Sequence, residues 1–330
     1  MSRPEISILG MGLPIIDRIG SVQVVPTSRE KSELRIVSKD LPPKHGGVIP
    51  NILSNYVALS SDTKQVHLLA AVGDDHAGSV YTRRLDQRIQ NIEVIRSQET
   101  AQLYDLLTPD GNRIWELFLG AAGYVSATPI HYRALERVNS YFIVDINTIR
   151  EPMIINEARK TLELASVNLA NTIINLSGIQ GIDETRIRKI SQILPQSPLA
   201  VFGNDEEFDV IDQSVLKNTV NNARLLVHTM GEAGSIMTFD GVTNHIQSVK
   251  VPDSEFRSSV GCGDSFMGSF LALCLAEKSD FWSARLLEQC ANFGSFIASE
   301  TAKSYDSRLH SSNLARLKGL YFKKHKIGDI

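Results

Sequence analysis

The sequence predicts an α/β fold with a mostly parallel central sheet, and three observations lead to that prediction. Short apolar runs alternate with longer segments of helical periodicity along most of the chain. The apolar runs are bounded by turn residues, as strands usually are. Two segments break the alternation, because they contain strand-like pieces without a convincing helix between them. Alternating strands and helices favour a parallel sheet that is covered by helices on both faces, which makes three layers.

Apolar runs give the expected strands, and the periodic segments between them give the expected helices. The expected strands cover residues 6–9, 66–72, 141–146, 172–176, 199–202 and 223–229. The expected helices cover residues 51–59, 153–168 and 183–194.

The two exceptional segments, 19–37 and 100–118, predict strands outside the main sheet. Pro109-Asp110-Gly111-Asn112 is a turn signal between two apolar arms, which is typical of a β-hairpin. We interpret these strands as a small β lid, formed by about residues 13–45 and 99–125. No internal repeat, low-complexity tract or linker stands out, so residues 1–330 are expected to form a single domain.

Composition excludes several classes of function. The 330 residues are 42% hydrophobic and 22% charged, as in an ordinary globular protein, and the net charge of −3 gives no basic face for nucleic acid. The basic cluster at 323–326 is most simply a solvated tail. Three cysteines are too few for a disulfide framework or a zinc site. No stretch has the pattern of a secretory signal or the length of a membrane span, so we expect a cytoplasmic protein.

The segment with the sharpest chemical signal is SSVGCGDSFMGSFLALCL, residues 258–275. Gly261-Cys262-Gly263 is a small, permissive turn that leads directly into an apolar helix. Free N–H groups and the positive end of the helix dipole make such a start an anion-binding site. Asp264 in the first turn is either a simple helix cap or an acid with a chemical role. A thiol such as Cys262 at a helix start is expected to have a lowered pKa, unless it only fills space.

Further motifs follow one another along nearly the whole chain. They are GLPIID (12–17), GGVIPN (46–51), VGDDHAG (72–78), LTPDGNR (107–113) with LGAAGYVS (119–126), NLSG (175–178), FGNDEEF (202–208) and TMGEAG (229–234). In this order, and ending in Gly-x-Gly-Asp, they resemble the ribokinase (PfkB) family of carbohydrate kinases, and within it the adenosine-kinase-like branch. The resemblance implies a ribokinase-like three-layer fold and an ATP-dependent phosphotransferase, whose substrate is a sugar or nucleoside hydroxyl.

The resemblance also implies roles at the acceptor side of the site. Asp264 would deprotonate the hydroxyl, while the N–H groups of Gly261, Cys262 and Gly263 hold the phosphoryl oxygens. The implied substrate-binding residues are Asp17, Gly46, Gly47 and Asn51. An ionised Asp17 suits substrate hydroxyls, because it can only accept hydrogen bonds. Without the family context, each of these residues also fits a turn or a helix start.

On the nucleotide side, the implied cofactors are ATP and Mg²⁺. The implied nucleotide-binding residues are Asn204, Thr229, Gly231, Gly234 and Asn292. Glu207 would hold Mg²⁺ through water, together with Asn204, because Mg²⁺ gives up its waters reluctantly. Arg113 on the hairpin either swings towards a ligand or is a surface charge. The lid allows a homodimer as well as a monomer.

The chain departs from the family pattern in two places. Ser258 occupies the usual acidic position before the glycine turn, and Lys303-Ser304 replaces a later Gly-Ala. These regions bind an activating monovalent cation in the family, so that cation is doubtful here, and the hypothesis is that Lys303 replaces its charge. Leu13 stands where the adenosine-kinase motif has asparagine, which makes adenosine itself less secure as the substrate.

Two alternatives to the kinase stay open. The departures at Ser258 and Leu13 fit a catalytically impaired kinase fold that acts as a binding or scaffold module. Gly10-x-Gly12 after the first strand is a fragment of the nicotinamide dehydrogenase fingerprint. Ile15 at the third glycine position leaves that fingerprint incomplete.

Overall fold

The computed structural model describes residues 6–21, 43–60, 65–107, 113–277, 280 and 282–325. Its largest element is a nine-stranded sheet with the order β15-β14-β13-β12-β11-β10-β1-β4-β6. These strands are β1 (Ser7–Met11), β4 (Val66–Leu69), β6 (Ile89–Gln90), β10 (Ser140–Asp145), β11 (Asn171–Asn175), β12 (Ala200–Asn204), β13 (Leu225–Thr229), β14 (Ser235–Phe239) and β15 (Val242–Ile246). Neighbours from β13 to β6 are parallel, whereas β14 and β15 add an antiparallel edge.

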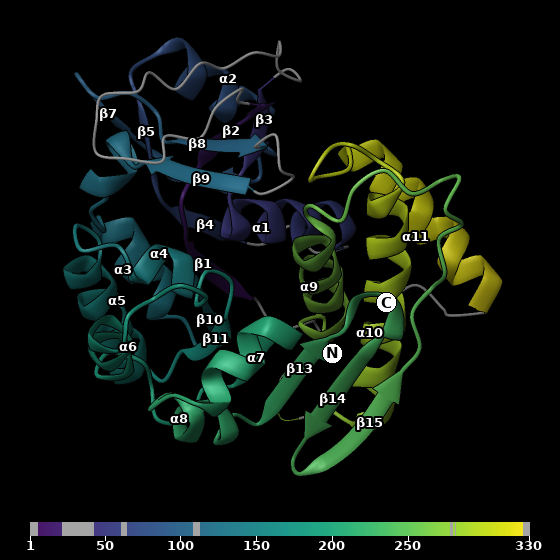
Figure 1. Cartoon of the computed structure of the whole chain (residues 1–330). Helices are drawn as coiled ribbons and strands as arrows, with labels where there is room; N and C mark the ends of the chain where they lie inside the picture. Colours follow the sequence, from purple (N-terminus) through teal and green to yellow (C-terminus); the bar gives the residue numbers. More distant parts are fainter. Residues whose placement is uncertain are drawn as a thin grey trace.

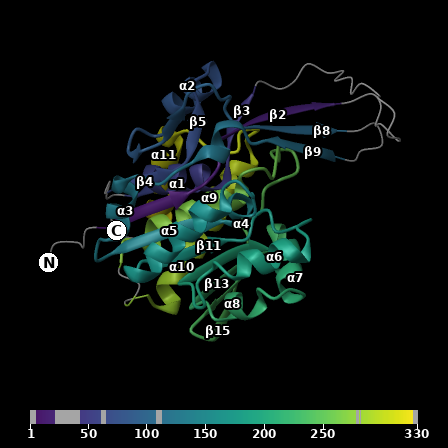
Figure 2. The same cartoon turned by 90° about the vertical axis from the view of Figure 1, so that its left-hand side faces the viewer.

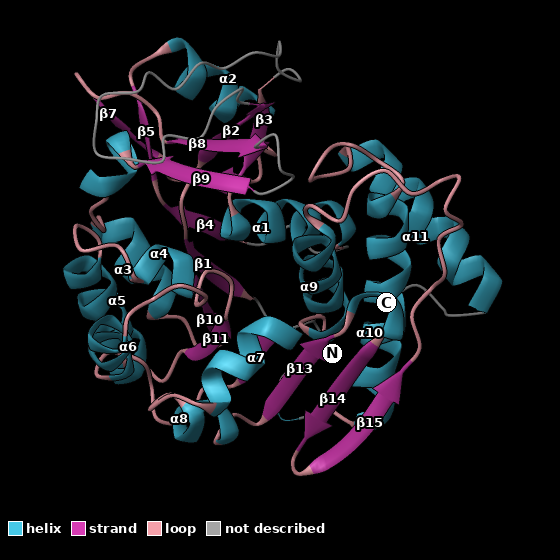
Figure 3. Ribbon diagram, in the orientation of Figure 1, coloured by secondary structure: helices cyan, strands magenta, loops and turns pink. Residues whose placement is uncertain are grey.

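Helices cover both faces of this sheet, as Figure 3 shows. They are α1 (Val48–Leu59), α2 (His76–Arg84), α3 (Pro129–Leu135), α4 (Ile146–Ile149), α5 (Ile155–Val167), α6 (Glu184–Ser191), α7 (Asp205–Asp212), α8 (Lys217–Asn221), α9 (Cys262–Cys274), α10 (Ala284–Ala302) and α11 (Ser311–His325), with short 3₁₀ turns η1 (Gly120–Tyr124) and η2 (Gly231–Ala233). The predicted three-layer α/β class is therefore confirmed.

Successive residues of β10 show why the layers form on both sides. Tyr141 and Ile143 pack into the core beneath α1, α9, α10 and α11, while Phe142 and Val144 pack beneath α3, α5 and α6. Side chains alternate across a strand, so a strand that is apolar at every position must be buried on both faces. The apolar runs identified in the sequence have this property.

A second sheet is small and contains the strands that the sequence placed outside the main layer. Its order is β3-β2-β8-β9, from β2 (Ile15–Ser21), β3 (Lys44–Gly46), β8 (Gln102–Leu107) and β9 (Arg113–Phe118). Figures 1 and 2 show this small sheet beyond the helix layers, above the start of α1. The antiparallel pairing of β8 with β9 confirms the hairpin. Its turn at 109–112, most of segment 19–37 and Lys326 lie outside the described residues, as does the side chain of Arg113.

Most other elements match their predicted positions within a few residues, but 66–72 is not one strand. It divides at Ala70 into β4, in the main sheet, and β5 (Ala71–Gly73), which pairs with β7 (Glu93–Ile95) in a two-stranded sheet. Ala70 accepts from the Glu93 amide, so the backbone changes partners within a continuous apolar run. Every residue of both strands is buried, which explains why the pattern does not reveal the break.

Within the described residues, none of the helices combines the length and the apolar character that crossing a membrane would require.

Candidate active site

The candidate site lies at the C-terminal edge of the parallel strands. Asp145, Asn175, Asn204 and Thr229 are the last residues of four neighbouring strands, β10 to β13. The N-terminus of α9 meets this edge in a cavity of about 130 Å³. Its lining comprises Asn175, Ser177, Phe202, Gly203, Asn204, Glu207, Thr229, Gly263, Asp264, Phe266 and Met267. Ends of parallel strands at one edge commonly form the ligand site of open α/β sheets.

The turn before α9 requires glycine at Gly261. This residue has a left-handed backbone with φ of 79°, and a Cβ added to it would lie 2.0 Å from the carbonyl oxygen of Ser307. The Cys262 amide donates to Ser259 at 3.2 Å. Gly263 lies in the first turn of α9, where backbone N–H groups lack an intrahelical acceptor and can donate to an anion. Gly263 is exposed and lines the cavity.

Tight packing of α1 against α9 brings Asn51 to Asp264. At Gly268 a Cβ would lie 2.5 Å from the carbonyl oxygen of Ile52, so only glycine allows this approach. Asn51 Nδ2 then donates to Asp264 Oδ2 at 2.8 Å. The Oδ1 atom of Asn51 is buried without a hydrogen-bond partner among the described residues. A buried acceptor is costly to leave unpaired, so Oδ1 is suited to a donor on a ligand.

The surroundings of Asp264 favour its protonated form. Burial raises its pKa to about 7, against the Asn51 hydrogen bond, and the carboxylates of Asp145, Asp17 and Glu207 raise it further. A carboxyl group with a pKa near neutrality is suited to exchanging protons.

The small sheet supplies a second carboxylate, Asp17, on β2. A Cβ on Gly46 would lie 2.2 Å from Asp17 Oδ2, so glycine lets the two strands close around this group. Gly47, with φ of 103°, has equally little room, because its Cβ would lie 2.0 Å from the Leu13 carbonyl oxygen. Tyr81 fixes the same loop by donating to the Gly46 carbonyl at 2.7 Å. Burial raises the pKa of Asp17 to about 7, against the nearby Lys44 and with the nearby Asp105.

Asn204 and Glu207 form a capping box at the start of α7. Asn204 Oδ1 accepts from the Glu207 amide at 3.0 Å, and Glu207 Oε2 accepts from the Asn204 amide at 2.9 Å. Burial raises the pKa of Glu207. Within the described residues, no group of three or more acidic, histidine or cysteine side chains could hold a metal ion alone. One or two carboxylates plus phosphates and water nevertheless suffice for Mg²⁺, so Glu207 fits a water-mediated role.

The remaining predicted nucleotide residues are placed differently. Thr229 lines the cavity and donates to the Gly203 carbonyl at 3.2 Å. Gly231 and Gly234 have positive φ in the turn after β13 and do not line this cavity. Asn292 lies on α10, where its amide donates to the Glu288 carbonyl. The cavity is smaller than a usual ligand pocket, so it has room for phosphoryl groups rather than for a whole nucleotide.

A family model for pfkB carbohydrate kinases matches residues 19–313. The chain belongs to this family. Curated proteins gave no significant match.

Solved structures of the pfkB fold resemble the whole chain at low identity. Adenosine kinase from Sinorhizobium meliloti has a TM-score of 0.71 and 17% identity, covering 96% of this chain and 100% of that chain. Ribokinase from Giardia lamblia has a TM-score of 0.73 and 14% identity, covering 98% of this chain and 100% of that chain. Burkholderia thailandensis nucleoside kinase in complex with inosine has a TM-score of 0.68 and 16% identity, covering 96% of this chain and 97% of that chain. The ribokinase-like fold is thus confirmed, whereas adenosine kinase and ribokinase match too evenly to select a branch.

Glycines 10 and 12 serve packing in this pfkB chain, which removes the dehydrogenase alternative. A Cβ on Gly10 would lie 2.7 Å from the Ile49 side chain, and one on Gly12 would lie 2.5 Å from it. Both residues let α1 lie close to β1. The dinucleotide fingerprint needs a helix directly after the glycines, but β1 is followed by β2.

Two features of the site differ from sequence reasoning or were missed by it. The expectation of a lowered Cys262 pKa is wrong, because burial and then the charge of Asp264 raise that pKa to about 11. Asp145 was missed. It is buried at the end of β10, accepts from the Thr148 amide at 2.7 Å and has a pKa raised to about 6 by burial. A carboxylate at the last position of an apolar strand is the sequence signal that could have identified Asp145.

Lys303 directly follows the last residue of α10, next to the loop that carries Ser258. The Ser258 amide donates to the Ala302 carbonyl, and the Lys303 ammonium group contacts Glu300 at 2.8 Å and Glu255 at 3.1 Å. A positive charge is therefore fixed beside the segment that leads into the glycine turn.

If Lys303 replaces a monovalent cation, turnover should not depend on K⁺. We expect equal rates when K⁺ is exchanged for tetramethylammonium at constant ionic strength, measured by ADP release. A strong loss of rate without K⁺ would contradict the replacement.

Proposed function

We propose that this chain is an ATP- and Mg²⁺-dependent kinase that phosphorylates a hydroxyl group of a sugar or nucleoside. Asp264 is the general base, and the turn of residues 261–264 is the anion hole. The observation that carries the proposal is that Asp264, at the start of a buried helix, lines one cavity with Asn204, Glu207 and Thr229. Membership of the pfkB family supports the reaction class.

In the proposed reaction, Asp264 takes the proton of the acceptor hydroxyl as its oxygen attacks the γ-phosphorus of ATP. The bond from that phosphorus to the β,γ-bridging oxygen breaks, which gives a phosphate ester and ADP. Asn51 orients the carboxylate through its Nδ2 hydrogen bond and offers Oδ1 to a substrate hydroxyl. Phosphoryl transfer depends mainly on positioning and charge stabilisation, which this constellation can provide.

The nucleotide would enter from the side of β12 and β13. Thr229, Gly231 and Gly234 would hold its phosphates, Asn204 and Glu207 would hold Mg²⁺ through water, and Asn292 would lie near the adenine. When bound, Mg²⁺ neutralises phosphate charge. Neutralisation matters because the site already contains several carboxyl groups that make its potential more negative. They are those of Asp17, Asp145, Glu207 and Asp264.

The small sheet would act as a lid over the acceptor in a single-domain enzyme. Asp17 and the Gly46–Gly47 loop would hold the substrate, and closure would exclude water so that ATP is not hydrolysed. Arg18 and Tyr104 both donate to Gln102 Oε1, at 2.5 and 3.2 Å. This cluster on β2 and β8 presents polar groups for acceptor selection.

A panel of sugars and nucleosides tests the proposal. Each compound is incubated with ATP and Mg²⁺, and ADP release is measured beside an Asp264→Asn control. The same panel is screened by thermal shift, since a ligand at 100 times its Kd adds about 2.7 kcal/mol of stability. Ligands that stabilise the protein but are never phosphorylated would favour the binding-module alternative.

The raised pKa of Asp264 predicts how activity depends on pH. A base must be ionised, so with a pKa of about 7 the active form is lost as pH falls below neutrality. We expect kcat/KM to rise about tenfold per pH unit below pH 7 and to level off above it. Asp17 titrates in the same range and should steepen the rise. A profile that is flat from pH 5 to 7 would contradict this role of Asp264.

A further inference from the structure

A larger cavity, of about 600 Å³, lies outside the candidate active site. It is lined by Pro43, Lys44, His45, Ser54, Ala58, Arg83, Arg84, Asp86, Asp306, Ser307, Arg308, Leu309, His310, Ser311 and Leu314. None of these residues lines the cavity at Asp264. The walls come from β3, α1, the end of α2 and the segment that leads from α10 into α11. A volume of this size is typical of small-molecule sites.

The charge of this lining is the opposite of that of the whole chain. Four cationic side chains, those of Lys44, Arg83, Arg84 and Arg308, face two carboxylates, whereas the chain has a net charge of −3. Within the described residues, none of the four cations forms an ion pair with a carboxylate. Lys44 instead donates to the Tyr305 carbonyl and lies near Asp17, and Arg84 contacts His45 Nδ1 at 3.2 Å. Like charges that share a cavity repel one another, so they favour an anionic partner.

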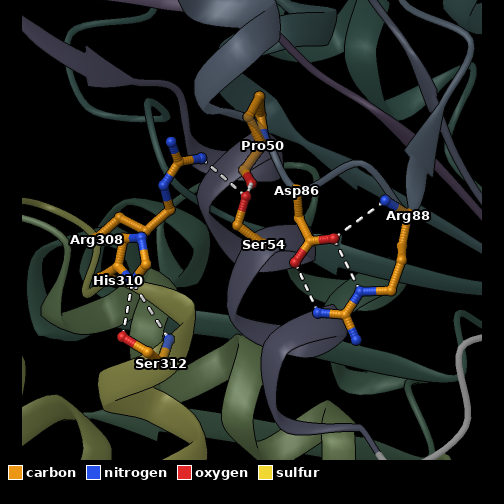
Figure 4. A network of polar contacts seen from close by, with 7 residues as sticks. All are labelled: Pro50, Ser54, Asp86, Arg88, Arg308, His310 and Ser312. Carbon is orange, nitrogen blue, oxygen red and sulfur yellow. Dashed lines mark hydrogen bonds and ion pairs between the residues drawn. The ribbon is translucent and has the colours of Figure 1, made fainter.

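Asp86, one of the two acids in the lining, does not neutralise these cations. Figure 4 shows Asp86 held by Arg88, which donates to its two carboxylate oxygens at 2.8 and 2.6 Å. The hydrogen bonds from Arg88 are the main cause that lowers the pKa of Asp86, and Arg308 adds a smaller effect, so most of the Asp86 charge is compensated outside the lining. Asp306, the other acid, is exposed. Four cations against Asp306 and the largely compensated Asp86 leave an excess of positive charge along the lining.

Neutral hydrogen-bonding groups complete the lining. Arg308 donates to Ser54 Oγ at 2.8 Å, which fixes the guanidinium against α1 (Figure 4). The Ser312 amide donates to His310 Nδ1, which leaves the proton of a neutral imidazole on Nε2 as a donor. Burial is the main cause that lowers the pKa of His45 to about 4, and the nearby Arg84 and Arg308 lower it further, against the charge of Asp306.

We propose that this cavity is a second binding site, which takes a small molecule carrying a phosphate monoester. Arginine guanidinium groups form charge-assisted, often bidentate hydrogen bonds with phosphate oxygens. Arg83 and Arg84 lie at its exposed rim and Arg308 is half-buried, so the phosphate has donors from two different elements. The remaining volume has room for the body of the molecule.

An occupant would touch segments that also hold the catalytic turn. The carbonyl group of Ser307 packs against Gly261, and Arg308 beside it bonds to Ser54, one turn along α1 from Asn51. These contacts join the cavity to both sides of Asp264 through two short connections. Binding at the cavity is nevertheless a property that can be measured without any turnover.

The test compares binding of inorganic phosphate and ribose 5-phosphate to the full chain by isothermal titration calorimetry. Wild-type protein should bind at least one probe saturably at millimolar concentration or below. Arg83→Gln/Arg84→Gln should weaken that binding at least about tenfold. Arg308→Gln should weaken it as well. Tighter binding of ribose 5-phosphate would support a phosphate monoester as the occupant, whereas equal binding of the two probes would contradict it in favour of free phosphate.

The matched control removes two exposed arginines from another short helix. Arg186→Gln/Arg188→Gln on α6 changes the net charge equally, at side chains that are 53% and 61% exposed. It should leave the affinity unchanged. Equal weakening in the control, unchanged binding in the Arg83/Arg84 variant, or no saturable binding by the wild type would each overturn the proposal. Binding retained by the Arg83/Arg84 variant would instead place the probe at the catalytic turn.

Discussion

Replacing Asp264 with asparagine is expected to lower kcat by about 10²- to 10⁴-fold, the usual contribution of a positioned general base. Asparagine keeps the size of the side chain and retains an oxygen that accepts from Asn51 Nδ2. It cannot take a proton from the acceptor hydroxyl. The measurement is ADP release with the best acceptor at saturating ATP, and turnover equal to wild type would remove Asp264 from the mechanism.

Folding of the Asp264→Asn variant can be predicted separately from its activity. The folded-state pKa of Asp264 is raised from 3.8 to about 7, so the folded protein holds this proton more tightly than the unfolded chain. Ionisation of Asp264 therefore opposes folding increasingly as pH rises from about 4 to 7. Removing the carboxylate should leave the melting temperature at pH 8 unchanged or higher. A large drop would mean that lost activity reports unfolding instead of lost base catalysis.

The sequence predicted the main layer well because its strands are buried on both faces and are therefore continuously apolar. The same property hid the division at Ala70, since an apolar run has no marker where the backbone changes partners. The edge hairpin of β14 and β15 was also missed, although Asp240-Gly241 is a turn signal with positive φ at both residues. Attention to parallel strands left that antiparallel addition unnoticed.

A short motif that fixes its own backbone can be recognised in a sequence, whereas contacts between distant segments cannot. Local chemistry alone led to the prediction that Gly261 to Asp264 form an anion-binding turn. The reversed pKa expectation for Cys262 illustrates the limit, because burial is a tertiary effect that exceeds the local influence of the helix start. The cavity around Arg84 and Arg308 was not foreseen for the same reason, since it joins segments more than two hundred residues apart in the sequence.

Replacing Gly261 with alanine is expected to damage both stability and turnover. Left-handed backbone costs about 1–3 kcal/mol for a residue other than glycine. The added Cβ would also lie 2.0 Å from the Ser307 carbonyl oxygen, so the turn or the segment that carries Ser307 has to move. Displacement of this turn would move Asp264 together with the amides of the proposed anion hole. We therefore expect the Gly261→Ala variant to have both a lower urea concentration at the unfolding midpoint and a lower kcat.

Gly263→Ala is the matched control, because it adds the same methyl group two residues later. Gly263 lies within α9, and a Cβ there would meet nothing within 4 Å. Alanine is favoured over glycine in a helix by about 1 kcal/mol, so this variant should be as stable as the wild type or more stable. Gly263 lines the cavity at Asp264, so this variant is a control for stability and not for turnover. Equal stability of the two alanine variants would show that neither the φ of 79° nor the Ser307 contact requires glycine, and that the shape of the turn does not depend on Gly261.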